Sequence, residues 1–104
     1  MVAQIERWRD EIDLIDAELL CLLNRRVLLA REVGRRKRGA GLPLRDVRRE
    51  RQILARAHKR NRGPLGAAAI ERLFRAILAE SRRATRHTLA REPALRAAGR
   101  RACA

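Results

Sequence analysis

The chain has 104 residues, 46% of them hydrophobic and 37% charged, with one Trp, one Phe and no Tyr. This length suits a single domain, and so few aromatic rings exclude a binder that stacks single-stranded bases. The net charge is +14, from 26 Lys and Arg against 12 Asp and Glu, which raises nucleic acid or an acidic surface as a partner. Solvated helix faces in an arginine-rich composition are the simpler explanation of this excess.

The apolar pattern is helical along the whole chain. Glycine and proline cluster between the helical patterns and no alternating β-branched run appears, so we predict an all-α fold. The N-terminus is charged and lacks a signal-peptide core, and no apolar run approaches membrane-spanning length, so we expect a cytoplasmic protein without a membrane partner. The two cysteines and two histidines lack metal-site spacing, and we predict neither a metal site nor a disulfide.

The longest helical pattern runs from Ile5 to Arg38. Its seam steps alternately by three and four residues, as an inward-facing stripe requires, through Ile5, Trp8, Ile12, Ile15, Leu19, Leu22, Arg26, Leu29 and Val33. Arg26 thus occupies a place on an apolar seam, and Lys37, three turns further on, projects within about 20° of the same direction. Two aligned cations inside an apolar pattern indicate a site for an anion.

This helix would be roughly 50 Å long at its usual rise per residue, which is more than a compact chain of this size covers by itself. Arg9 is rotated about 100° from Arg26 around the helix, so it reaches the same pocket only from a second chain. The pattern therefore predicts an intertwined dimer.

The remaining helices follow after a break. Glycines and Pro43 interrupt the first pattern, so residues 39–45 should form a loop. A second helix should begin near Asp46, a good N-cap residue, and end near Arg60. A third should run from residue 66 or 67 into the eighties.

Polar residues interrupt both of these helices at regular spacing. Asp46, Arg49 and Glu50 share one face of the second helix, as either an exposed salt-bridge cluster or one wall of the cationic pocket. Ser81 and Thr85 continue the inner face of the third helix, where they either bond back to helix carbonyls or face that pocket.

The domain is expected to span residues 1–90. Residues 91–104 are rich in Ala and Arg and are interrupted by Pro93 and Gly99, so we expect a basic, disordered C-terminal tail.

The polar residues that interrupt the apolar pattern lie on three predicted helices and one loop. They are Arg9, Arg26, Lys37, Arg45, Asp46, Arg49, Glu50, Ser81 and Thr85. Over roughly residues 4–87, this layout resembles the all-helical chorismate mutases. The matching segments are Arg9-x-x-Ile12-x-x-x-Asp16, Leu22-Leu23-x-x-Arg26, Gly34-x-x-Lys37, Leu42-Pro43-x-Arg45-Asp46-x-x-Arg49-Glu50 and Leu73-Phe74-x-x-Ile77-x-x-x-Ser81.

The resemblance implies a three-helix protomer with a long first helix, intertwined with a second copy into a six-helix homodimer that has two active sites. It implies an isomerase that rearranges chorismate to prephenate, a step toward phenylalanine and tyrosine. It implies no metal and no coenzyme.

By the same resemblance, arginines recognise the two carboxylates of the substrate. Arg26 and Arg49 would each hold a carboxylate, Ser81 would assist one of them, and Arg9 would arrive from the partner chain. Arg45 would lie nearby as a further substrate-binding residue.

The resemblance also assigns the ether oxygen and the ring hydroxyl. Lys37 would contact a carboxylate and the ether oxygen, while Glu50 and the backbone at Asp46 would hold the hydroxyl. Thr85 departs from the family pattern, because a glutamine or glutamate is expected there as a second donor to the ether oxygen, and threonine is shorter.

Two other functions fit parts of the pattern. An isochorismate pyruvate lyase, or a mutase acting on an amino analogue of chorismate, would use the same cations, although the segment from Arg45 to Glu50 favours the mutase. A basic, helical nucleic-acid-binding dimer fits the net charge but does not explain why Arg26 lies on the apolar seam.

Overall fold

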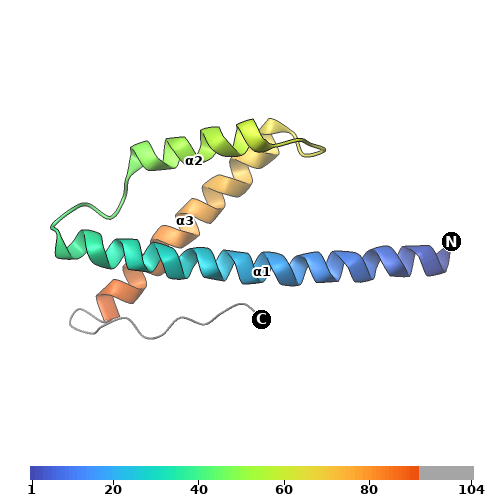
Figure 1. The fold of residues 1–104 in the computed structure, drawn as a ribbon, viewed down its shortest axis with the longest axis horizontal. Coiled ribbons are helices and arrows are strands. Elements are labelled where there is room, and N and C mark those ends of the chain that lie inside the picture. The colour runs from blue at the N-terminus through green and yellow to red at the C-terminus, as the bar shows by residue number, and fades with distance from the viewer. Residues whose placement is uncertain (92–104) are drawn as a thin grey trace.

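The computed structural model describes residues 1–91, and within them the chain forms three helices. These are α1 (Val2–Gly39), α2 (Val47–Arg60) and α3 (Ala67–Arg91). Figure 1 shows α1 as one long rod, which α3 crosses diagonally on its way from the end of α2. The predicted all-α fold with a long first helix is confirmed.

Two features mark the end of α1. Its last turn carries three cations, Arg36, Lys37 and Arg38, which complement the negative end of the helix dipole. The chain then turns at Gly41, whose φ of +71° lies in the left-handed region that glycine adopts without steric cost.

The start of α2 is capped as the sequence predicts. The Asp46 carboxylate accepts a hydrogen bond from the backbone N–H of Arg49 at 3.0 Å, while Asp46 itself keeps an extended backbone. Because this bond satisfies one of the unpaired N–H groups of the first turn, it fixes where α2 begins and hence where Arg49 and Glu50 point.

The core is small and centred on α3. Its buried apolar side chains are Leu54 of α2 and, on α3, Ile70, Leu78 and Leu89. Within the described residues, α3 packs on both α1 and α2, whereas α1 and α2 do not pack on each other. α3 therefore sets the spacing between the other two helices.

The crossing of α1 and α3 depends on Gly34, which is buried. A Cβ atom at this position would lie 2.6 Å from Cγ2 of Thr85, closer than side-chain carbons can approach. The missing side chain thus lets α1 lie directly against α3 at Thr85.

The apolar seam of α1 is uncovered over its N-terminal half. This half extends beyond α2 and α3 in Figure 1. Four of its seam residues, Trp8, Ile12, Ile15 and Leu19, keep 51–54% of their surface exposed, and Leu22, just beyond this half, keeps 55%. So many half-exposed large apolar side chains along one stripe indicate a surface that binds another protein.

Some predictions concern residues beyond this part of the chain. The division into a domain of residues 1–90 and a tail of residues 91–104 stays a prediction, because all of the tail except Arg91 lies outside the described residues. The prediction of no disulfide does not hold for Cys21, which is not a free thiol, while Cys103 lies outside the described part. Among residues 1–91, no helix combines the length and apolarity that crossing a membrane requires.

Candidate active site

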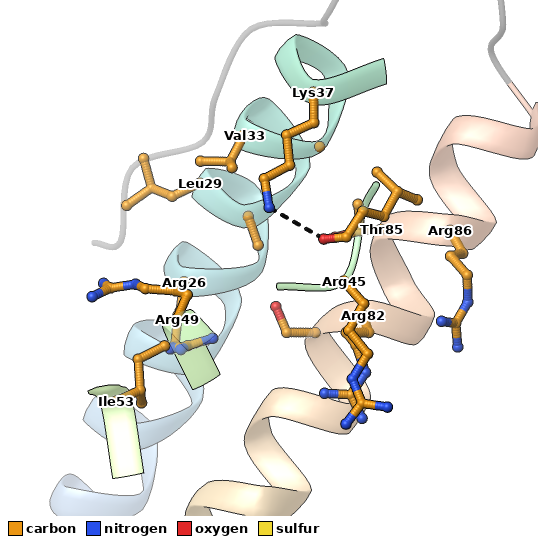
Figure 2. A pocket seen from close by; sticks show the side chains of 14 residues that line it. Arg26, Leu29, Val33, Lys37, Arg45, Arg49, Ile53, Arg82, Thr85 and Arg86 are labelled. Atoms are coloured by element: carbon orange, nitrogen blue, oxygen red, sulfur yellow. Dashed lines mark hydrogen bonds between the residues drawn. The ribbon is translucent and has the colours of Figure 1, made fainter. Parts of the chain in front are cut away.

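A cavity of about 310 Å³ lies among α1, α2, α3 and the loop that joins α1 to α2. We call it the central cavity, and Figure 2 shows the side chains around it. Its lining consists of Arg26, Leu29, Ala30, Val33, Gly34, Lys37, Leu44, Arg45, Arg49, Ile53, Ser81, Arg82, Thr85 and Arg86. This size suits a small metabolite.

Six of the predicted site residues line this cavity, and they come from every segment that forms it. They are Arg26 and Lys37 from α1, Arg45 from the loop, Arg49 from α2, and Ser81 and Thr85 from α3. The angular argument from the first helical pattern, which placed Arg26 and Lys37 on one side of the helix, thus agrees with the structure.

Arg26 and Arg49 bring two positive charges together from different helices. Burial lowers the pKa of Arg26, and the charge of neighbouring Arg49 lowers it further. An arginine stays protonated even so, which means that Arg26 keeps its charge in a partly desolvated place beside the positive charge of Arg49. An anion bound there would relieve this repulsion, so the pair favours a negatively charged ligand.

Lys37 and Thr85 approach the cavity from opposite helices. The ammonium of Lys37 donates to the backbone carbonyl of Leu44 at 3.3 Å, the dashed line in Figure 2. Thr85 is 6% exposed, and its hydroxyl oxygen is buried without a hydrogen-bond partner among the described residues. Of the two alternatives for Thr85, bonding back to its own helix is not seen, and Thr85 is among the residues that line the cavity.

Glu50 lies beside the cavity rather than in its lining. Its carboxylate accepts hydrogen bonds from Arg82 of α3 and from Arg45 of the loop, the latter at 3.4 Å. The Glu50 side chain is only 16% exposed, so the exposed-cluster interpretation of this face is wrong for Glu50. Asp46 is also outside the lining, where it caps α2.

Arg9 is not brought to the cavity within one chain. It lies in the part of α1 that extends away from α2 and α3 in Figure 1, and its side chain, 69% exposed, pairs with Glu6 at 3.3 Å. The sequence argument placed Arg9 in the site only through a second chain, and that step stays a prediction.

Two cavity cations were not among the predicted residues. Arg82 and Arg86 each follow a predicted site residue on α3, namely Ser81 and Thr85. Arg82 and Arg86 are four residues apart, as Ser81 and Thr85 are, and this spacing indicates that the two arginines share one face of α3. With them, the lining carries six cations, and the carboxylate of Glu50 pairs with two of these, Arg45 and Arg82.

This arrangement favours the binding of an anionic molecule over acid–base chemistry. The cations converge on an apolar wall that includes Leu29, Val33 and Ile53. Within residues 1–91, no three His, Cys, Asp or Glu side chains are grouped so as to hold a metal ion. The cavity can bind carboxylates through paired hydrogen bonds from arginine guanidinium groups and through the charge of a lysine.

Comparison with known proteins identifies the chain independently. Residues 8–86 match the family chorismate mutase type II. The bifunctional chorismate mutase/prephenate dehydratase of Neisseria gonorrhoeae is 43% identical over 72 residues, which cover 69% of this chain and 19% of that protein. The enzyme of the same name from Aquifex aeolicus is 35% identical over 79 residues, which cover 72% and 22%. The chain thus spans about a fifth of the length of these curated relatives.

A solved structure of similar size also matches. Chorismate mutase (Form I) from Thermus thermophilus has a TM-score of 0.74 and 37% sequence identity, over 75% of this chain and 98% of that one. The order of polar residues, the fold and the family match over residues 8–86 agree, and this chain belongs to the type II chorismate mutase family.

Proposed function

We propose that this chain rearranges chorismate to prephenate, an intermediate on the way to phenylalanine and tyrosine, in the central cavity. The observation that carries the proposal is that Arg26, Lys37 and Arg49 line one partly buried cavity from two different helices. The family membership supports the same reaction, because the relatives named above include chorismate mutases.

The reaction needs restraint of the substrate more than chemical groups. A concerted intramolecular rearrangement requires no nucleophile and no proton removal. Chorismate is a dicarboxylate, and Arg26 and Arg49 can each hold one carboxylate through two parallel hydrogen bonds. Fixing both ends in the compact reactive shape converts a flexible molecule into a near-attack conformer.

Lys37 supplies the charge stabilisation. As the ether bond of chorismate breaks, its oxygen gains negative charge, which an ammonium group in a partly desolvated site stabilises. Lys37 now donates to the carbonyl of Leu44, and it would exchange that neutral acceptor for the ether oxygen in the transition state.

Thr85 takes the place of the second donor. Its buried hydroxyl has no other partner in the described part of the chain, so its hydrogen-bonding capacity is unused. A hydroxyl held this close to its helix is a weaker and shorter donor than an amide, so Lys37 carries most of the stabilisation.

The complete site is that of a homodimer. The half-exposed seam of α1 would be covered by a second chain, and burial of each seam residue is worth on the order of 1 kcal/mol. The same N-terminal half of α1 carries Arg9, which a partner chain can place at the cavity. Each dimer would then hold two sites, each with one Arg9 from across the interface.

Mixing two inactive variants tests this shared site. Arg9→Ala and Arg26→Ala each damage both sites of a homodimer, but a mixed dimer keeps one intact site. With random association, half of the dimers are mixed, so about a quarter of the wild-type activity should return. If the subunits exchange and no activity returns, the two residues do not serve one site.

Product identification tests the reaction. Purified protein is incubated separately with chorismate and with isochorismate, and prephenate and pyruvate are measured. We expect prephenate from chorismate and no pyruvate from either compound. Pyruvate release from isochorismate without prephenate formation would show a lyase instead.

A further inference from the structure

Arg82 is a cation of the cavity lining whose position suggests a role through another residue. We infer that Arg82 is a positioning residue, which holds the carboxylate of Glu50 in the direction needed to bind the ring hydroxyl of the substrate. The inference rests on the proposed function and on the role that the family resemblance implies for Glu50, because it concerns how that same site holds chorismate.

Glu50 has two arginine partners, and they differ in how firmly they can hold its carboxylate. Nη1 of Arg82 donates to Oε2 of Glu50, and Nη2 of Arg45 lies 3.4 Å from Oε1. Arg82 is 25% exposed, whereas Arg45 is 58% exposed and lies on the loop. A partly buried, charge-assisted bond orients a side chain far better than a long, exposed one. Arg82 is therefore the partner that fixes the carboxylate.

The fold makes this bond a link between helices. Glu50 lies in the first turn of α2, and Arg82 lies on α3 next to Ser81. Since α1 and α2 do not pack on each other in the described residues, α3 is the support from which α2 residues can be aimed at the cavity. A glutamate without such a bond would sample several rotamers at the edge of the site.

The carboxylate keeps capacity for the substrate. Each of its oxygens has two acceptor directions, and the bonds to Arg82 and Arg45 use one on each. The remaining directions are free to accept a hydroxyl proton. Arg82 is at the same time partly neutralised by Glu50, which makes it a poorer ligand for a substrate carboxylate than Arg26 or Arg49.

A double-mutant cycle separates action through Glu50 from direct action. The wild type, Arg82→Met, Glu50→Gln and the double variant are compared on chorismate by steady-state kinetics. Alone, Arg82→Met should raise KM by about 10-fold and leave kcat within about 3-fold, because a hydroxyl contact is made in both ground and transition states. In the Glu50→Gln background, the same change should cost less than about 2-fold.

Matched variants control for folding and for charge. Arg83→Met removes a neighbouring arginine that is 70% exposed and paired with Glu80, and it should leave both constants unchanged. Arg82→Lys, which keeps the charge near Glu50, should recover most of the loss. If Arg82→Met unfolds at the assay temperature, Arg82→Gln takes its place in the cycle.

Each outcome decides between the two claims. A wild-type protein that does not convert chorismate refutes the proposed function and this inference with it. An active wild type in which Arg82→Met costs as much in the Glu50→Gln background refutes the inference alone, because Arg82 then acts directly on the substrate or on the scaffold.

Discussion

Gly34→Ala should destabilise the protein, because it adds one methyl group where α1 crosses α3. The new Cβ would lie 2.6 Å from Cγ2 of Thr85, 3.5 Å from Cδ1 of Leu89 and 3.6 Å from Cδ2 of Leu44. The last two distances are ordinary contacts, but the first is roughly 1 Å shorter than the optimal separation of two carbons. Thr85 is buried and β-branched, so it cannot swing aside.

The magnitude follows from two opposing effects. Replacing glycine by alanine inside a helix favours the helix by about 1 kcal/mol. Overpacking a rigid core contact costs about 1–3 kcal/mol, and an overlap near 1 Å belongs to the upper part of that range. We therefore expect the free energy of unfolding to fall by about 1–2 kcal/mol. Thr85 would also shift at the cavity, which should lower activity as well.

Denaturant unfolding at one fixed protein concentration measures this change, since the stability of a dimer depends on concentration. Gly39→Ala is the matched control, because its Cβ would meet no atom within 4 Å, and its stability should equal or exceed that of the wild type. Adding Thr85→Ser to Gly34→Ala removes the clashing Cγ2 atom and should recover most of the loss. If Gly34→Ala is as stable as Gly39→Ala, or if Thr85→Ser recovers nothing, the close crossing does not exist as described.

Two further predictions concern the donors of the site and a surface cluster. Lys37→Met should lower kcat on chorismate by on the order of 10²-fold, and Thr85→Val by about 10-fold or less. Thr85→Gln should keep or raise kcat. If Thr85→Val lowers kcat more than Lys37→Met does, the substrate assignment is reopened. A hydrogen bond from His58 of α2, 2.6 Å away, and then Arg75 lower the pKa of Glu71 on α3. A carboxyl group whose pKa is lower in the folded than in the unfolded chain stabilises the fold at pH values above its unfolded pKa. This stabilisation is lost as the pH falls through the folded pKa. The stability deficit of Glu71→Gln should therefore shrink from about pH 6 toward about pH 3, and a deficit independent of pH would contradict this.

Periodicity along single helices predicted most of the fold. The α1 seam, the Asp46 cap and the end of α2 at Arg60 follow from local spacing and local hydrogen bonds, which a sequence contains in full. The same holds for Arg26 and Lys37, because their alignment depends only on the rotation per residue along one helix.

Features that depend on how two helices cross were not predicted. Arg82 and Arg86 are each one residue beyond a predicted site residue, and whether that residue faces the cavity depends on the crossing of α3 over α1. The role of Gly34 has the same origin, although a glycine inside a strong helical pattern is itself a signal of close packing. The position of Arg9 in the site depends on a second chain and stays a prediction.

The central claim is that the cavity around Arg26 converts chorismate. The most direct measurement compares prephenate formation by the wild type, Arg26→Leu and the exposed-arginine control Arg83→Leu, with the melting temperature of each. The wild type and Arg83→Leu should form prephenate, while Arg26→Leu should lose most of this activity and melt at the same or a higher temperature, because the change relieves repulsion with Arg49. A folded Arg26→Leu protein that forms prephenate at the wild-type rate would contradict the claim.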